Sequence, residues 1–292
     1  MSKTVKTFLS RLLSTVVLWA IVVVAFVLGS HALFFALIAA IALLGLFEYF
    51  HLLKQATGSR RFMLPTLLVS MCYLAYLFQY RDGASPATLG AADGLAIAAL
   101  IIILIITRLG SALEGRKSLN EILLALFGFT YVILLFSFAA KILCLPLVNE
   151  AGESTSAWYV LFFVVVTKLT DTGAYCVGSL IGRHKCIPHI SPGKTWEGLG
   201  GGLLFAFIGA FACRYWFPDH LAALGSTSLL LLVTLSLSIV SIIGDLAESI
   251  LKRTLEIKDS GQVMPGIGGV LDLIDSLLFT APVLYLYLIL IG

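Results

Sequence analysis

Charged residues are scarce in this sequence of 292 residues. Asp, Glu, Lys and Arg make up 12% of the chain, whereas hydrophobic residues make up 60%. Soluble globular proteins carry about 25% charged residues, so this chain has too little charge to cover a water-facing surface. The mean hydropathy of +1.03 agrees. The composition excludes a water-soluble globular protein and predicts an all-α, polytopic integral membrane protein.

Cysteine pairs at a metal-binding spacing are also missing. The sequence has no C-x-x-C pair, and its cysteines are scattered at Cys72, Cys144, Cys176, Cys186 and Cys213. Most of them lie inside apolar runs, where cysteine behaves as a small hydrophobic residue. We therefore expect no disulfide framework and no cysteine-ligated metal. The net charge of +3 is too small to indicate nucleic acid as a partner.

Long apolar runs fill the rest of the chain, and about 20 such residues suffice to cross a bilayer. A second run follows the first at once, so we expect the first to be retained rather than cleaved as a signal peptide. Residues 1–150 should hold spans one to five and residues 151–292 spans six to nine of one membrane domain. The nine expected spans are Ser14 to Leu28, Ala32 to Leu53, Phe62 to Tyr80, Ala92 to Leu109, Leu119 to Leu143, Ala157 to Thr170, Leu199 to Phe217, Ser228 to Ser249 and Val270 to Ile291.

Lysine and arginine are unevenly divided between the two sides of this scheme. Of the 19 basic residues, only Arg81, Lys141 and Arg214 fall in the expected outer segments. Basic residues near span ends are retained on the cytoplasmic side. The division predicts a cytoplasmic N-terminus and places the segments after spans two, four, six and eight in the cytoplasm.

Polar residues gather in the C-terminal half, at the expected cytoplasmic ends of spans. Ionisable groups at such positions are candidates for function. The clusters are Lys168–Tyr175, Ser191–Gly198 and Gly244–Ser276.

The third cluster combines acids and bases. Asp245 and Glu248 would share a helix face, as would Asp272 and Asp275. Carboxylates brought together repel unless a cation neutralises them, and oxygen ligands suit Mg²⁺ rather than zinc. The bases between the two pairs, which could hold phosphate oxygens, are Lys252, Arg253 and Lys258. This combination indicates phosphoryl or nucleotidyl transfer.

The tripeptide Gly193–Thr195 in the second cluster looks like the end of a P-loop. Pro188, however, stands where a P-loop has its first glycine, and no strand is expected before it. We therefore reject a Walker A site. Lys194 and the hydroxyls of Ser191 and Thr195 still lie on a turn that opens a helix, where free backbone N–H groups favour anions.

These residues also resemble a family signature. Ser249 to Asp259 matches Ser-x-x-Lys-Arg-x4-Lys-Asp, and Pro265 to Asp275 matches Pro-Gly-His-Gly-Gly-x-x-Asp-Arg-x-Asp with two departures. Further matching stretches are Asp171–Tyr175, Ser191–Gly198 and Gly244–Ser249. The chain thus resembles the phosphatidate cytidylyltransferases, or CDP-diacylglycerol synthases, from Lys168 to Ser276.

The resemblance implies a membrane enzyme of phospholipid synthesis that converts CTP and phosphatidate into CDP-diacylglycerol and pyrophosphate with Mg²⁺. It implies membrane lipids as partners, permits a homodimer, and suggests a bacterial inner membrane with the active site on the cytoplasmic side. The expected ligands of one or two metal ions are Asp171, Asp245, Asp272 and Asp275. The expected catalytic residues are Asp245, Asp272, Asp275, Lys252, Arg253 and Lys258. The residues expected to bind CTP and its phosphates are Asp171, Ser191, Lys194, Thr195 and Asp259.

Ile267 stands where the family pattern has His, and Leu273 where it has Arg. A phosphate monoester has a second pKa of about 6, so phosphatidate is largely ionised at neutral pH and needs no strong base. Metal ions and cationic side chains can neutralise the charge of the phosphates and place them for the reaction. We therefore expect an active enzyme, with a multi-pass transporter or an inactive relative as alternatives. The roles of Glu48 and Trp196 stay open.

Overall fold

The computed structural model describes residues 24–26, 28–257 and 269–291. Seven helices in these residues are long and apolar enough to cross a membrane, and the shorter helix Met63–Phe78 is also apolar. This confirms the expected all-α, polytopic membrane architecture.

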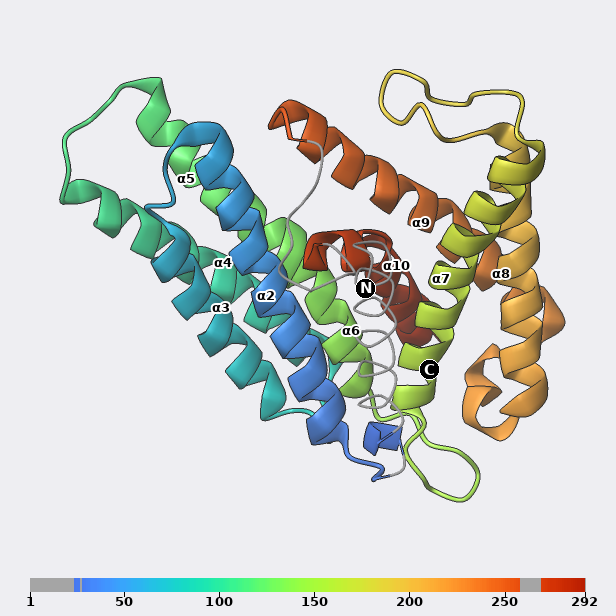
Figure 1. The fold of residues 1–292 in the computed structure, drawn as a ribbon. Helices are drawn as coiled ribbons and strands as arrows, with labels where there is room; N and C mark the ends of the chain where they lie inside the picture. Colours follow the sequence, from blue (N-terminus) through green and yellow to red (C-terminus); the bar gives the residue numbers. More distant parts are fainter. Residues whose placement is uncertain (1–23, 27, 258–268, 292) are drawn as a thin grey trace, which may run out of the picture. The chain divides into compact units, whose positions relative to one another are not determined.

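Figure 1 shows the helices in chain order, coloured from blue to red. Their bounds are α2 His31–Thr57, α3 Met63–Phe78, α4 Pro86–Leu109, α5 Arg116–Gly128, the π-helix η1 Phe129–Leu134, α6 Leu135–Leu143, α7 Ser156–Ile181, α8 Trp196–Trp216, the 3-10 helix η2 Asp219–Leu224, α9 Thr227–Thr254 and α10 Val270–Ile291.

Each expected span from the second onward corresponds to helix in the structure, whereas Ser14 to Leu28 lies mostly outside the described residues. The sixth span was expected to end at Thr170, but α7 continues to Ile181. Asp171 is therefore a residue within a helix rather than at its end. The fifth span is built from α5, η1 and α6. Its π-helical part follows Gly128, where a Cβ atom would lie 2.4 Å from the Tyr49 ring.

The described residues form two compact units, and the first takes Met1–Leu145 and Leu255–Ile274. In this unit α2 packs against α3 and α6, and α3 packs against α4. A charged pair lies among these helices, with Lys141 Nζ 2.6 Å from Asp93 Oδ2. Tyr73 donates its hydroxyl to the other Asp93 oxygen at 2.7 Å. Lys141 is only 1% exposed, so it is a buried helix residue rather than a cation of an outer loop.

The second unit takes Pro146–Thr254 and Asp275–Gly292. Here α7 and α8 run side by side in opposite directions, joined by the loop 182–195 (Figure 1). The G-x-x-x-G spacing of Gly198 and Gly202 predicts close helix packing, and the structure confirms it. A Cβ on Gly198 would lie 2.8 Å from the Ala174 carbonyl oxygen, and one on Gly202 would lie 2.9 Å from that of Thr170. Helix α9 packs against both α7 and α8.

Candidate functional site

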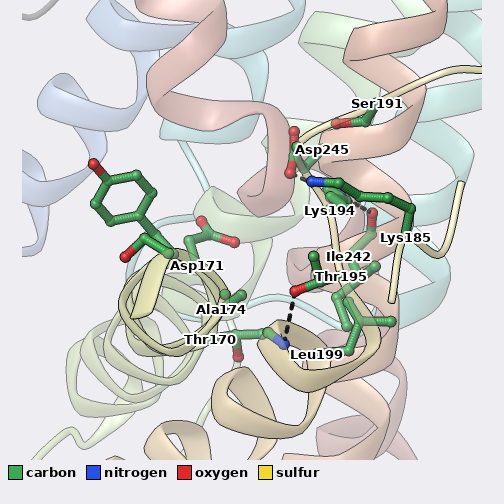
Figure 2. Close-up of a pocket in the computed structure, with 15 residues that line it drawn as sticks. Thr170, Asp171, Ala174, Lys185, Ser191, Lys194, Thr195, Leu199, Ile242 and Asp245 are labelled. Atoms are coloured by element: carbon green, nitrogen blue, oxygen red, sulfur yellow. Dashed lines mark hydrogen bonds and ion pairs between the residues drawn. The ribbon is translucent and has the colours of Figure 1, made fainter. Parts of the chain in front are cut away.

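A cavity of about 450 Å³ opens in the second unit, where the loop 182–195 meets α7, α8 and α9 (Figure 2). This volume lies in the range of small-molecule sites. Its lining combines hydroxyls, two lysines, two carboxylates and small residues. The lining residues are Thr170, Asp171, Ala174, Tyr175, Gly178, Ser179, Lys185, Ser191, Gly193, Lys194, Thr195, Gly198, Leu199, Ile242 and Asp245.

The loop 182–195 is shaped by hydrogen bonds at its two ends. The Thr195 hydroxyl accepts from Gly198 N at 3.1 Å and so caps the N-terminus of α8. Cys186 N donates to the Lys194 carbonyl at 3.2 Å, and Trp196 N donates to the His184 carbonyl at 2.9 Å. The loop therefore closes on itself as a hairpin.

Glu197, in the first turn of α8, ties the start of the loop to this hairpin. Its carboxylate accepts from the backbone N–H groups of Arg183, at 3.1 Å, and His184, at 3.2 Å. It also lies 2.6 Å from His184 Nδ1. The sequence analysis did not single out Glu197, although a carboxylate in the first turn of a helix is a familiar signal for contacts with free N–H groups.

Lys194 enters the cavity from the loop. Its Nζ atom lies 2.8 Å from Asp245 Oδ2 and donates to the Ile242 carbonyl at 3.2 Å. The Lys194 side chain is 16% exposed and the Asp245 side chain 39% exposed. This partly buried ion pair places an ammonium group and a carboxylate at the wall of the cavity.

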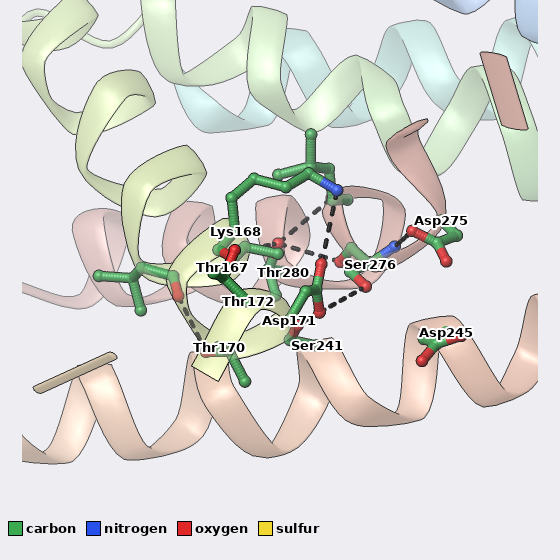
Figure 3. A network of polar contacts seen from close by, with 12 residues as sticks. Thr167, Lys168, Thr170, Asp171, Thr172, Ser241, Asp245, Asp275, Ser276 and Thr280 are labelled. Atoms are coloured by element: carbon green, nitrogen blue, oxygen red, sulfur yellow. Dashed lines mark hydrogen bonds and ion pairs between the residues drawn. The ribbon is translucent and has the colours of Figure 1, made fainter. Parts of the chain in front are cut away.

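Asp171 faces polar groups from two other helices (Figure 3). Its Oδ1 atom accepts from the Ser241 hydroxyl at 3.1 Å and from the Ser276 hydroxyl at 3.3 Å. Its Oδ2 atom lies 3.5 Å from Lys168 Nζ. Both oxygens of this carboxylate are thus engaged, one by hydroxyls and the other by an ammonium group.

Three further carboxylates converge where α9 meets α10. Oxygens of Asp245, Glu248 and Asp275 all lie within 4.8 Å of one another, and both Glu248 and Asp275 are buried. Gly244 permits this approach, since a Cβ there would lie 2.8 Å from the Asp275 carbonyl oxygen. Carboxylates this close require compensating positive charge; two lysines supply part of it in this structure, and the all-oxygen donor set suits Mg²⁺. The residues present therefore fit a divalent cation.

The remaining residues predicted from the sequence do not line the cavity. Lys252 contacts the group of three carboxylates, with its Nζ 3.0 Å from Glu248 Oε1, and Arg253 is exposed one residue further on. Asp272 belongs to the first unit, in the first turn of α10, where it accepts from Gly269 N at 3.3 Å. Lys258, Asp259 and Ile267 lie outside the described residues.

The structure also describes Glu48 and Trp196, whose roles the sequence leaves open. Glu48 is fully buried in the first unit, and its Oε2 accepts from Leu271 N, in the first turn of α10, at 2.9 Å. Glu48 is thus buried among the packed helices of this unit. Trp196, the first residue of α8, is 64% exposed.

The structure brings Asp171, Ser191, Lys194, Thr195 and Asp245 together at one cavity, and their roles stay predictions. It adds residues that the prediction left out. The sequence could have predicted Glu248, because its spacing of three residues from Asp245 places both side chains on one helix face. Lys168 could have been predicted in the same way from its spacing of three residues to Asp171.

Fold and site together define a class: a multi-pass integral membrane protein whose second unit carries lysines and carboxylates around one cavity. The chain belongs to the Cytidylyltransferase family, whose model matches residues 9–291.

Several relatives share long stretches with this chain. A phosphatidate cytidylyltransferase of Staphylococcus haemolyticus is 38% identical over 203 residues, which cover 65% of this chain and 76% of that protein. One of Haemophilus influenzae is 32% identical over 279 residues, which cover 93% of this chain and 95% of that protein. Family membership supports a nucleotidyltransferase enzyme over the transporter alternative.

Proposed function

We propose that this chain is a CTP:phosphatidate cytidylyltransferase, which makes CDP-diacylglycerol and pyrophosphate. A phosphate oxygen of phosphatidate forms a bond to the α-phosphorus of CTP, and the bond from that phosphorus to the β-phosphate oxygen breaks. The observation that carries the proposal is the cavity lined by Lys194 and Asp245 in a member of the Cytidylyltransferase family.

The cavity offers several groups to a triphosphate. Lys185 and Lys194 supply positive charge, and the hydroxyls of Ser191 and Thr195 supply hydrogen bonds. The N-terminus of α8 begins at the same place, and helix N-termini favour anions. Lys194 would exchange its contact with Asp245 for a phosphate oxygen when the nucleotide binds.

The group of Asp245, Glu248 and Asp275 would hold Mg²⁺. The ion supplies positive charge against the developing negative charge on the phosphate oxygens. The protein's part is to keep the three carboxylates within one small volume, which Gly244 does by letting α9 approach α10 closely. We assign the ion to these three because their oxygens lie within 4.8 Å of one another, whereas neither Asp171 nor Asp272 belongs to that group.

The attacking group needs no strong base in this reaction. A phosphate monoester with a second pKa of about 6 is already largely ionised at neutral pH. Catalysis then rests on orientation and on charge neutralisation. This explains how a chain with Ile267 in place of the family's His can retain activity.

The site would face the cytoplasm of a bacterial cell, because CTP is found there. The unequal division of basic residues supports this orientation. Phosphatidate would reach the site from the bilayer, since the helices that carry the site are apolar enough to lie within it.

An assay of the purified protein in lipid–detergent micelles tests the proposal. The protein should convert radiolabelled CTP and phosphatidate into CDP-lipid with equal release of pyrophosphate, and chelation of Mg²⁺ should stop both. ATP, GTP and UTP in place of CTP, and other lipid phosphates in place of phosphatidate, define the specificity. Absence of CDP-lipid from protein that is folded and supplied with Mg²⁺ would refute the proposal.

A further inference from the structure

Arg214 differs from the other two basic residues that the sequence predicts on the outer side of the membrane. Arg81 Nη2 lies 3.4 Å from Asp82 Oδ2. Lys141 Nζ lies 2.6 Å from Asp93 Oδ2. Among the residues that the structure describes, Arg214 pairs with no carboxylate. Because basic residues are kept mainly on the cytoplasmic side, an arginine without an acidic partner on the other side is a candidate for binding an anion.

Arg214 lines a cavity of about 230 Å³ at the end of α8, where η2 leads into α9. Its Nη1 atom donates to the Leu224 carbonyl at 2.9 Å, which holds the guanidinium against the end of η2. A guanidinium carries five N–H donors in a planar fork, and this is the only hydrogen bond of the Arg214 side chain within the described residues. Most of its donors are therefore available to a ligand in the cavity.

The start of α9 supplies further donors to the same cavity. The hydroxyls of Ser226 and Thr227 line it, and Ser226 Oγ accepts from Leu229 N at 3.2 Å as an N-cap of the helix. The first turn of a helix also carries backbone N–H groups without helical partners and a partial positive charge. None of the described residues that line the cavity is acidic. The polar groups around it thus favour an anion.

The cavity lies at the opposite end of α8 from the loop 182–195 (Figure 1). Helix α8 has 21 residues, which at 1.5 Å per residue span about 30 Å, the thickness of the hydrocarbon core. Tyr215, which lines the cavity, is 82% exposed, and Trp216 is 68% exposed. Tyr and Trp concentrate at the two membrane–water interfaces. The cavity is therefore at the depth of lipid headgroups, in the leaflet opposite the candidate CTP site.

An apolar face of α8 leads from this cavity towards the membrane interior. Phe211 and Tyr215 line the cavity. They follow Leu204 and Ile208 at spacings of three or four residues, which places all four on one face of the helix. Leu204 and Ile208 are both exposed, as is Phe211. The acyl chains of a lipid whose headgroup occupies the cavity would pack along this face.

We propose that this cavity is a binding site for the phosphate group of an anionic phospholipid. Phosphate oxygens would accept hydrogen bonds from the Arg214 guanidinium, whose planar fork matches two oxygens of a phosphate, and from the hydroxyls at the start of α9. A zwitterionic headgroup also has an ammonium group, for which the described lining offers no carboxylate. Phosphatidylglycerol, whose headgroup is uncharged beyond its phosphodiester, fits this set of groups.

The size of the cavity also favours a headgroup over a nucleotide. Its volume of about 230 Å³ is about half that of the cavity lined by Lys194, at about 450 Å³. It lies below the range of about 300–1,000 Å³ that is typical of small-molecule sites. A bound lipid would therefore place only its headgroup in the cavity and would link the ends of α8 and α9. This inference does not rest on the proposed function, because lipid binding can be measured without CTP.

Hydrogen–deuterium exchange of the full chain in nanodiscs locates the lipid. Nanodiscs of phosphatidylcholine alone are compared with nanodiscs that also contain phosphatidylglycerol with the same acyl chains. We expect phosphatidylglycerol to slow amide exchange in residues 219–230 of the unmodified protein and of the control Arg81→Gln, whose arginine already has an acidic partner. Arg214→Gln should lose this effect. Absence of the effect from the unmodified protein, its persistence in Arg214→Gln, or an equal effect in the loop 182–195 would each overturn the inference.

The dependence of this protection on the phosphatidylglycerol content of the nanodiscs measures the affinity of the site. Arg214→Gln should weaken the affinity about 10-fold or more, because a hydrogen bond to a charged group is lost. Arg214→Lys keeps the charge without the planar fork, so its affinity should lie between those of Arg214→Gln and the unmodified protein. Thr227→Val keeps the side-chain shape and should weaken the affinity by a smaller factor. These two variants decide the case if Arg214→Gln does not fold, since full affinity in both would contradict the inference.

A soluble headgroup distinguishes a lipid site from a site for free phosphate esters. Glycerophosphoglycerol, added to phosphatidylcholine nanodiscs, should leave exchange in residues 219–230 unchanged, because it lacks the acyl chains that pack along α8. Protection by this compound would assign the cavity to a soluble phosphate ester and overturn the lipid assignment. The proposed function is tested separately: absence of CDP-lipid would refute that function and leave the exchange result as it stands.

Discussion

The ammonium group of Lys194 lies 2.8 Å from Asp245 Oδ2 and thereby joins the loop before α8 to helix α9. The two residues are 51 positions apart in the sequence, and both line the cavity. In the absence of nucleotide each neutralises the other. A triphosphate and a divalent cation together would replace this contact, because the phosphates attract the lysine and the cation attracts the carboxylate.

Lys194→Met should weaken CTP binding and slow the reaction. Loss of one phosphate-binding cation predicts a fall in kcat/KM of about 10²-fold or more. Steady-state kinetics with varied CTP measures the effect, and Lys54→Met, at an exposed position of α2, is the control. Full activity of Lys194→Met would show that Lys194 does not contribute to CTP binding.

Asp245→Asn, Glu248→Gln and Asp275→Asn should each abolish most turnover. Each substitution removes a charge while keeping nearly the same shape, and the expected loss is about 10³-fold or more. Mn²⁺ affinity, measured without nucleotide, should fall in the same variants. The assignment of the metal would be wrong if all three variants bound Mn²⁺ normally and kept most of the activity.

Glu197→Ala should loosen the start of the loop 182–195. The backbone N–H groups of Arg183 and His184 would lose their acceptor. Because the cavity itself keeps its groups, we expect a rise in KM for CTP of about 10-fold with a smaller change in kcat. Glu197→Gln retains one acceptor oxygen, so its KM for CTP should lie between those of the unmodified protein and Glu197→Ala. An effect on kcat alone would indicate that Glu197 acts in the chemical step instead.

The loop 182–195 should face the cytoplasm. A single cysteine at Ser191, in a cysteine-free background, should resist an impermeant thiol reagent in sealed right-side-out vesicles. One at Glu150, in the exposed turn between α6 and α7, should react and serves as the matched control. Labelling of Ser191→Cys from the outside would reverse the orientation. Ser260→Cys, in the segment 258–268, should behave like Ser191→Cys.

The departures Ile267 and Leu273 should not prevent activity. We expect the unmodified protein to make CDP-lipid and Ile267→His to change its rate only modestly. Pyrophosphate release is compared among the unmodified protein, Ile267→His, Leu273→Arg and the double variant. Activity confined to the double variant would show that the unmodified chain is an inactive relative.

The class of protein and the approximate position of each described span follow from the amino-acid sequence alone. Hydrophobicity is a local property, and a run of about 20 apolar residues can only satisfy its backbone in a bilayer as a helix. The polar clusters were equally visible, because charge is conspicuous in so apolar a chain. Helix ends were less well determined, since α7 continues to Ile181 with Asp171 inside it.

Which polar residues meet depends on the packing of the helices in three dimensions. Asp171 and Ser276 are 105 positions apart and touch because α7 packs near α10. The spacing of Asp245 and Glu248 placed them on one helix face, but Asp275 joins them only because Gly244 lets α9 and α10 approach closely. Contacts between distant segments depend on how helix surfaces fit together, and local patterns of hydrophobicity and charge do not contain that information.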